Sequence, residues 1–177
     1  MIEVIPLFTI NVFKVKIKDW SKKHRDRILD LVPTDSQVSN GSGVSPIHYT
    51  DYHDNKKPPY YDELMKILQP YLDDFFKEHD LSYIATLWCQ KYTAGDCHLP
   101  HDHGSVGFSA VLYAKLDSDV HPSTLFFPPF PSENGTKVSK SFRVEEGDLI
   151  IFPAHVLHMA PPHYDDKMRV IFSFNLI

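Results

Sequence analysis

The stretch CHLPHDHGSVGFSAVLYA, residues 97–114, places three histidines within six residues and leads into an apolar segment with the pattern of a β-strand. Residues i and i+2 of a strand point to the same side, so a His-x-His pair at its edge presents two imidazoles to one point in space. His101 and His103 have this spacing. The stretch therefore predicts half of a metal site at the edge of a β-sheet.

The third ligand of such a site must come from a distant part of the chain. The best candidate is the segment EEGDLIIFPAHVLHMAPP, residues 145–162, in which an apolar strand pattern is followed by Pro153, His155 and His158. Either histidine can complete the set. An isolated His-x-His pair is more often a polar surface loop, but two separate histidine motifs, each at the end of a predicted strand, favour a metal site with imidazole ligands.

Composition limits the class of protein. The chain has 177 residues, of which 42% are hydrophobic, and a net charge of −5. These values indicate one domain over residues 1–177 and argue against a surface that coats nucleic acid. No window approaches the ~18 consecutive apolar residues of a membrane helix, and the N-terminal sequence lacks the pattern of a secretory leader. We therefore expect a cytoplasmic protein with neither nucleic acid nor membrane as partner, and free thiols at Cys89 and Cys97.

The first part of the chain predicts one strand and supporting helices. Residues 11–17 alternate apolar and polar side chains, as a half-buried strand does, and a short helix is expected before Pro33. The Ser- and Gly-rich residues 34–45 indicate a mobile loop. Residues 61–79 carry apolar side chains at i, i+3, i+4 and i+7, which predicts an amphipathic helix. Pro70 is expected to kink or split this helix.

After residue 80 the pattern changes to short apolar runs separated by Gly, Pro and Asn, which predict β-strands. We expect an α+β, mainly β fold in which helices within residues 19–80 pack on a sheet. The strands of the core, residues 81–177, are expected to close into a sandwich or barrel. The expected strands are residues 81–92, 106–116, 124–127, 141–144, 148–152 and 168–176.

The second part of the chain also contains three linked motifs. They are Trp88-x-Gln90-x-Tyr92-x-x-Gly95-Asp96, then Pro100-His101-x-His103, then Ser109-Ala110-Val111-Leu112-Tyr113. Together they resemble the core of the Fe(II)/2-oxoglutarate-dependent oxygenases, in particular small members similar to prolyl hydroxylases. Residues 145–162 are similar to the strand that carries the distal ligand of these enzymes. MRVIFSFNL, residues 168–176, resembles their last core strand, whose arginine binds the far carboxylate of 2-oxoglutarate.

The resemblance implies a double-stranded β-helix (a jelly-roll, cupin-like barrel) that uses Fe(II), 2-oxoglutarate and O2 to hydroxylate an unidentified substrate. It also implies two sets of site residues. The metal ligands would be His101, His103 and His158, and the cofactor-binding residues would be Arg169, Tyr113, Ser173 and Tyr92. A peptidyl proline, another protein side chain and a small molecule all remain possible substrates, and the oligomeric state is open.

The residues themselves support the place of Arg169. On a regular strand, Arg169, Ile171 and Ser173 share one face. An arginine that projects inward needs an anion, because a buried unpaired charge costs several kcal/mol. A dicarboxylate cofactor can supply that anion through bidentate hydrogen bonds. The alternative is a surface ion pair with Asp165 or Asp166.

Two features depart from the family pattern. The usual iron site has His-x-Asp/Glu followed by a distal histidine, whereas this chain has His103 in place of the carboxylate. Asp102 cannot simply substitute, because on a regular strand it points away from His101. Ile171 stands where many members have a serine, and Ser173 on the same face could donate instead.

Two other interpretations follow from the same residues. Gly95-x5-His101-x-His103 and Gly147-x5-Pro153, followed by His158, also resemble the two cupin motifs, and three-histidine sites occur in that family. Against a typical cupin, no glutamate follows His103 by four or five residues. The chain could also be a non-catalytic metal- or sugar-binding barrel, since a fold alone does not establish activity.

Two further features have milder interpretations. His98 and His155 either orient a metal ligand or are plain loop histidines, and the latter is the commoner case. The aromatic and proline-rich residues 126–135 predict a stiff loop. This loop either borders the substrate pocket or only covers one end of the barrel, and we favour the second.

Overall fold

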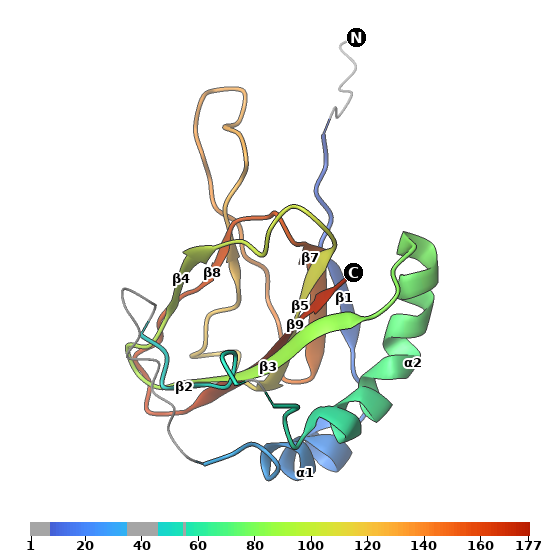
Figure 1. The fold of residues 1–177 in the computed structure, drawn as a ribbon. Coiled ribbons are helices and arrows are strands. Elements are labelled where there is room, and N and C mark those ends of the chain that lie inside the picture. Colours follow the sequence, from blue (N-terminus) through green and yellow to red (C-terminus); the bar gives the residue numbers. More distant parts are fainter. Residues whose placement is uncertain (1–7, 35–45, 55) are drawn as a thin grey trace.

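The computed structural model describes residues 8–34, 46–54 and 56–177, which form two antiparallel sheets with helices on one side (Figure 1). The strands are β1 (Phe13–Lys16), β2 (Tyr49–Thr50), β3 (Ile84–Tyr92), β4 (His98–His101), β5 (Phe108–Lys115), β6 (Leu125–Phe126), β7 (Asp148–Pro153), β8 (His158–Ala160) and β9 (Arg169–Leu176). The helices are the π-helix η1 (Trp20–His24), α1 (Arg25–Leu29) and α2 (Tyr61–His79). The larger sheet has the order β1-β7-β5-β9-β3-β2, and the smaller has the order β4-β8-β6.

The alternation of side chains along β9 separates two layers of the interior. Val170 and Phe172 belong to the apolar cluster that includes the buried residues of α2. Ile171 belongs to a second cluster, and it lines a pocket together with Ser173. Arg169 shares the face of Ile171 and Ser173 and is only 2% exposed. The two-residue period of the strand therefore directs its polar side chains away from the helix layer.

Helix α2 covers the outer side of the larger sheet (Figure 1). Leu64, Leu68 and Leu72 recur every four residues, fall on one side of the helix and are buried. Burial of each leucine contributes roughly 1.5–3 kcal/mol, which together offsets the ~3 kcal/mol that an internal proline costs. The helix accordingly runs through the exposed Pro70, so of the two predicted outcomes, a kink or a split, the split does not occur. Among the described residues, no helix combines the length and apolar character needed to span a bilayer.

Most of the predicted strands are present in shortened form, and two kinds of correction are needed. Residues 141–144 form no strand, because the backbone next to them pairs only through a single bridge between Phe126 and Lys140. Conversely, the sequence does not predict β2, β4 and β8. All three strands are short and are defined by their backbone pairing with a neighbouring strand. The predicted loop at residues 34–45 falls, except for its first residue, outside the described residues.

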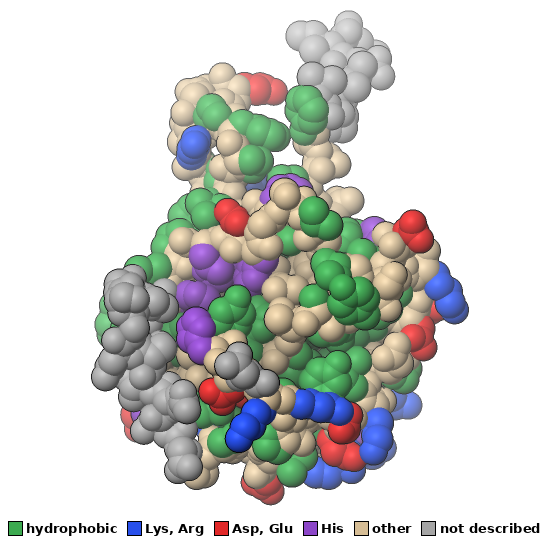
Figure 2. Space-filling view, viewed as in Figure 1, with side chains coloured by type: hydrophobic (Ala, Val, Ile, Leu, Met, Phe, Trp, Pro, Cys, Tyr) green, Lys and Arg blue, Asp and Glu red, His purple; other side chains and the backbone are tan. Residues whose placement is uncertain are grey.

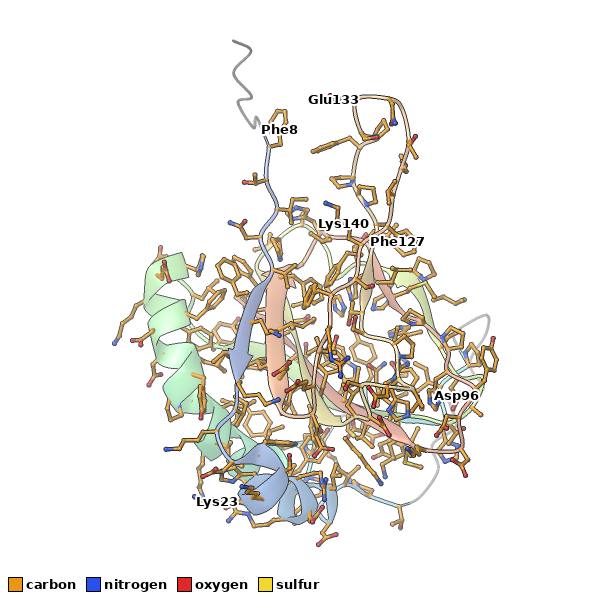
Figure 3. The ribbon with its side chains drawn as sticks, turned by 180° about the vertical axis from the view of Figure 1, so that it is seen from behind. Phe8, Lys23, Asp96, Phe127, Glu133 and Lys140 are labelled. Atoms are coloured by element: carbon orange, nitrogen blue, oxygen red, sulfur yellow. The ribbon has the colours of Figure 1, made fainter. Side chains whose placement is uncertain are left out.

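The loop between Phe127 and Lys140 projects from the sheets, with Glu133 near its tip (Figure 3). Its Phe130 contacts Phe8 of the N-terminal segment, with ring centroids 5.9 Å apart. The loop lines a groove of about 480 Å³ that shares no lining residue with the two pockets at the histidines. This separation argues against the alternative that the loop borders the pockets at the histidines, and its role as a cover of one end of the fold stays a prediction.

Candidate metal and cofactor site

The pairing of two short strands builds the histidine cluster. β4 runs antiparallel to β8, and His101 lies directly opposite His158 in their register. His103 follows the end of β4, and its backbone N–H donates to the carbonyl of Ala154 at 2.9 Å. One ligand nitrogen from each of the three histidines lies within 4.8 Å of the others. The structure thus brings together the predicted ligands, whereas His155 is exposed and is not part of the cluster.

Backbone carbonyls fix the tautomer of two of these histidines. Nδ1 of His101 lies 2.7 Å from the carbonyl oxygen of Leu99, and Nδ1 of His158 lies 2.8 Å from that of Val156. A carbonyl oxygen only accepts hydrogen bonds, so both Nδ1 atoms carry the proton. Each Nε2 therefore keeps the lone pair that a metal needs, with its ring oriented by an outer partner.

Burial keeps the three imidazoles neutral. Removal from water, with a smaller contribution from neighbouring histidines, lowers the pKa of His158 to about 3 and that of His103 to about 4. The pKa of His101 is also lowered, again mainly by burial. Because metals bind the neutral form of imidazole, the three side chains are ready to act as ligands near neutral pH.

A fourth histidine lies against the cluster. The ring of His98 stacks on that of His101, with centroids 3.7 Å apart and planes 22° apart. Its Nδ1 lies 3.2 Å from Nε2 of Gln90, an amide nitrogen that donates. His98 thus contacts one of the predicted ligands, and its role in orienting that ligand stays a prediction. Asp102 is exposed and accepts a hydrogen bond from the backbone N–H of Gly104 at 2.9 Å, so it does not join the cluster.

Arg169 is buried and makes no ion pair with any carboxylate of the described residues. Its two Nη atoms donate to the carbonyls of Pro122 at 2.9 Å and Pro161 at 3.0 Å. Its Nε is buried and finds no hydrogen-bond partner in the part of the chain that the structure describes. Burial lowers the pKa of the guanidinium. The alternative, a surface ion pair with Asp165 or Asp166, therefore does not form.

The two candidate tyrosines differ in what their hydroxyl groups bind. The hydroxyl of Tyr113 pairs with Oγ1 of Thr124 at 2.8 Å and also accepts the backbone N–H of Thr124 at 3.1 Å. The hydroxyl of Tyr92 is buried and has no hydrogen-bond partner among the described residues, and its ring lies 4.4 Å from the guanidinium carbon of Arg169. Tyr92 Oη and Arg169 Nε are thus unpaired polar groups, whereas the hydroxyl of Tyr113 is already engaged.

Two pockets meet at the histidines. The inner pocket has a volume of about 20 Å³, room for about one water molecule, and is lined by Tyr92 and Ser173 as well as the histidines. The outer pocket has a volume of about 420 Å³ and opens where Figure 2 shows histidine side chains gathered at the surface. Trp88 and Gln90 border both pockets. A ligand from the outer pocket therefore meets the histidines first, and reaching Tyr92 requires the inner pocket to widen.

A buried carboxylate that the sequence did not point to fixes one wall of the outer pocket. Asp51 accepts a hydrogen bond from the hydroxyl of Tyr60 at 2.6 Å and from the backbone N–H of Cys89 at 2.7 Å. The next residue, Tyr52, packs edge-on against Trp88 with ring centroids 4.9 Å apart. Asp51 thus ties the segment that carries Tyr52 to β3. Asp51 lies in a short polar stretch whose sequence predicts a loop, so no pattern in the sequence identifies it as a buried residue.

The comparison with protein families identifies the class of this protein. A family model with the description "Putative 2OG-Fe(II) oxygenase" matches residues 86–175, a little over half of the chain. The chain belongs to this family, which confirms the resemblance seen in the sequence. The family uses Fe(II), 2-oxoglutarate and O2, and the cluster of His101, His103 and His158 fits the iron. A comparison with curated proteins finds no match.

Solved structures with a similar fold include two prolyl hydroxylases. The viral collagen prolyl hydroxylase of Paramecium Bursaria Chlorella virus-1 has a TM-score of 0.59 at 14% identity, over 93% of this chain and 94% of that one. For the Pseudomonas putida prolyl-4-hydroxylase the TM-score is 0.58 at 14% identity, over 95% and 92% of the two chains.

An alpha ketoglutarate dependent epimerase from nogalamycin biosynthesis is also similar, with a TM-score of 0.68 at 12% identity over 94% of this chain and 77% of that one. At such identities the likeness concerns the fold alone. It supports the predicted mainly β architecture, because the fold matches the double-stranded β-helix of the 2-oxoglutarate oxygenases.

The variant His158→Ala should lose tight binding of a divalent metal, because it removes one of three converging nitrogen atoms. Loss of an outer partner alone costs 10–100-fold in metal affinity, so we expect a decrease of at least roughly 100-fold. Calorimetric titration with Co(II) measures this. The matched control is His155→Ala, an exposed histidine three residues away, which should bind like the wild type. Equal affinities of the two variants would contradict the proposed ligand set.

The metal-free protein should lose stability as the pH falls from 6.5 towards 4. An unfolded histidine binds its proton near pH 6.5, whereas folded His98, His103 and His158 have pKa values lowered to between about 3 and about 4. Between these values the unfolded state holds more protons, so the free energy of unfolding decreases with decreasing pH.

We expect the melting temperature to fall by roughly 5 °C or more between pH 6.5 and 4.5, measured by calorimetry with a chelator present. His158→Leu should reduce this slope and His155→Ala should not. A slope that is the same in all three proteins would show that the histidine cluster does not control the pH dependence.

Proposed function

We propose that this protein is an Fe(II)- and 2-oxoglutarate-dependent dioxygenase that hydroxylates a substrate bound at the outer pocket. The observation that carries the proposal is Arg169, a buried cation on the same face of β9 as Ser173, which forms no ion pair with a carboxylate of the described residues. An uncompensated buried charge is strongly destabilising. The distal carboxylate of 2-oxoglutarate is an anion that can compensate it, and the family uses this cosubstrate.

The metal-binding role is assigned to the three converging histidines. His101 and His158 would bind iron through Nε2, because their Nδ1 atoms donate to backbone carbonyls that hold the rings in place. His103 would supply the third nitrogen. Its ring lies parallel to that of His158 within 14°, with centroids 5.2 Å apart.

The cofactor-binding role is assigned to the groups around the guanidinium. Arg169 Nε and the hydroxyl of Tyr92 would donate to the distal carboxylate, because both are buried and unpaired. Ser173 would join them by exchanging its hydrogen bond to Gln90, which is 3.3 Å long. Tyr113 would act less directly, because its hydroxyl is bound by Thr124.

Iron and 2-oxoglutarate, when bound, supply the oxidising chemistry that puts an oxygen atom from O2 into a C–H bond. The protein supplies binding, orientation and shielding from water. Aromatic rings border the ligands, with Phe152 at 4.7 Å from His158 and Trp88 at 5.7 Å from His103 between centroids. Three neutral imidazoles add no negative charge, so the metal would attract an anionic cosubstrate more strongly than a site that contains a carboxylate.

We propose only the class of the substrate, which is either a protein side chain or a small molecule. The outer pocket, at about 420 Å³, is within the usual range for small-ligand sites. Two of the similar structures are prolyl hydroxylases and the third is an epimerase, so they do not distinguish these classes.

One observation favours a second candidate. The inner pocket, at about 20 Å³, admits 2-oxoglutarate only after side chains move. The alternative is a cupin-type three-histidine metalloprotein that binds its substrate directly at the metal, from the outer pocket, without a 2-oxo acid. A metal-binding barrel without catalytic activity would use the same residues.

Anaerobic titration of the protein with Fe(II) and then 2-oxoglutarate separates these candidates. We expect a saturable visible charge-transfer band, which reports a 2-oxo acid bound to Fe(II). Arg169→Gln should weaken 2-oxoglutarate binding by roughly 10–100-fold, because hydrogen bonds to charged groups contribute about 1.5–3 kcal/mol. The control Arg143→Gln replaces an exposed arginine and should leave the titration unchanged. Iron binding without a band would favour the cupin-type candidate.

A further inference from the structure

Two loops hold the guanidinium of Arg169 in place. Nη1 donates to the carbonyl of Pro122 in the loop between β5 and β6, and Nη2 donates to the carbonyl of Pro161 in the loop between β8 and β9. Both acceptors belong to the backbone, so the direction of the guanidinium depends on where the two loops lie. The unpaired Nε is oriented by the same two contacts.

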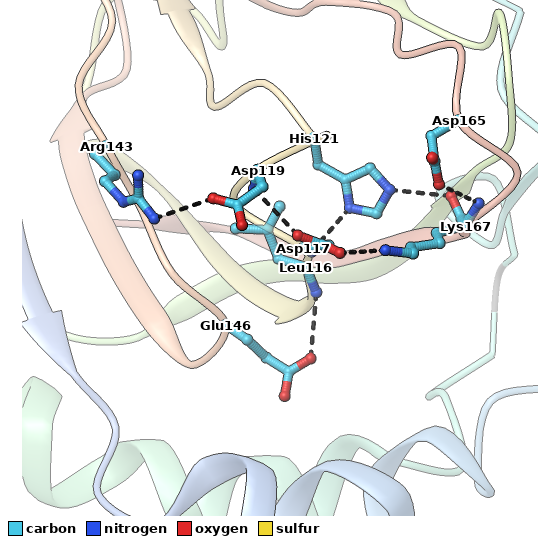
Figure 4. Close-up of polar contacts among 8 residues, drawn as sticks. All are labelled: Leu116, Asp117, Asp119, His121, Arg143, Glu146, Asp165 and Lys167. Atoms are coloured by element: carbon cyan, nitrogen blue, oxygen red, sulfur yellow. Dashed lines mark hydrogen bonds and ion pairs between the residues drawn. The ribbon is translucent and has the colours of Figure 1, made fainter.

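One buried side chain joins these loops. His121, which is 4% exposed, immediately precedes Pro122. Its Nδ1 accepts the backbone N–H of Asp117 at 3.0 Å in the first loop, and its Nε2 donates to the carbonyl of Lys167 at 3.0 Å in the second loop (Figure 4). The ring also packs edge-on against His163 of the second loop, with centroids 4.4 Å apart. His121 therefore spans the space between the loops.

The other side-chain link between the loops in Figure 4 is exposed to solvent. Lys167 Nζ lies 2.5 Å from Oδ2 of Asp117, but these side chains are 55% and 33% exposed. Exposed ion pairs contribute little, because water screens them and ordering the side chains costs entropy. Removing the buried imidazole, in contrast, would leave the N–H of Asp117 and the carbonyl of Lys167 without their partner. The imidazole is thus the stronger restraint.

We propose that His121 is a positioning residue for 2-oxoglutarate. It fixes the carbonyl of Pro122 and thereby the direction of the Arg169 guanidinium, which receives the distal carboxylate. Neither His121 nor Arg169 lines the two pockets, so a ligand reaches the guanidinium only when the inner pocket widens. His121 lies behind the guanidinium, next to Pro122, and acts only through Arg169. This inference rests on the proposed function. It predicts that a change at His121 weakens binding of the distal carboxylate of the cosubstrate and leaves binding of the metal and of the 2-oxo acid group unchanged.

The test compares two ligands of the Fe(II)-loaded protein under anaerobic conditions. One is 2-oxoglutarate, and the other is 2-oxopentanoate, which has the same chain length and 2-oxo acid group but no distal carboxylate. His121→Phe should weaken 2-oxoglutarate binding roughly tenfold, because loss of a group that orients a binding residue costs about that much. Its affinity for Fe(II) and for 2-oxopentanoate should be unchanged. His121→Gln, which keeps a terminal N–H donor, should restore part of the affinity.

The matched control is Lys167→Met, which removes the exposed ion pair between the same loops but keeps the backbone carbonyl that His121 binds. It should bind both ligands like the wild type. Wild-type 2-oxoglutarate affinity in His121→Phe, or an equal loss for both ligands, would overturn the inference. If His121→Phe does not retain Fe(II), the same comparison is made with His121→Gln. A loss of affinity for 2-oxoglutarate but not for 2-oxopentanoate supports the inference, and an equal loss, or none, overturns it.

Arg169→Gln, measured in the same series, separates the two levels of the proposal. If it binds 2-oxoglutarate like the wild type, the anchor in the proposed function is wrong. If it loses affinity while His121→Phe does not, only the role of His121 is wrong.

Discussion

The buried charge of Arg169, which forms no ion pair within the described part of the chain, is the constraint around which the inner face of the larger sheet is arranged. A buried cation without a counter-charge is destabilising, and burial accordingly lowers the pKa of this guanidinium. Two carbonyls and the face of the Tyr92 ring compensate part of the charge. They leave Arg169 Nε and the Tyr92 hydroxyl without hydrogen-bond partners in residues 8–34, 46–54 and 56–177. A ligand with a carboxylate group at its far end would satisfy both.

The histidine cluster extends the same electrostatic pattern. In the common arrangement of two histidines and one carboxylate, the protein supplies one negative charge to the iron. Here His101, His103 and His158 are neutral, because burial lowers the pKa of each. A divalent metal and a buried arginine would therefore meet no negative charge from these ligands. A dianion such as 2-oxoglutarate, bound to both, would supply the charge that the missing carboxylate does not.

Periodic patterns account for the parts of the structure that the sequence predicts. Helix α2 has the predicted bounds because its apolar residues follow the 3.6-residue period, and the two faces of β9 follow from the period of two. The short strands β4 and β8 have no such pattern, and the sequence of β4, HLPH, even contains a proline. They are strands because each pairs with the other. Similarly, only tertiary packing decides that Tyr113 meets Thr124 while Tyr92 stays unpaired. The ligand histidines were predictable from their spacing, but the two prolyl carbonyls that hold Arg169 were not, because backbone groups carry no signal in the sequence.

The most direct test of a single site formed by the histidines and Arg169 is an anaerobic crystal structure with Mn(II), as a redox-inert substitute for iron, and 2-oxoglutarate. We expect the metal on His101, His103 and His158, and the distal carboxylate of 2-oxoglutarate within hydrogen-bond distance of Arg169 Nε and the Tyr92 hydroxyl, in a widened inner pocket. A metal held by other residues, or a 2-oxoglutarate whose distal carboxylate lies away from Arg169, would contradict this arrangement.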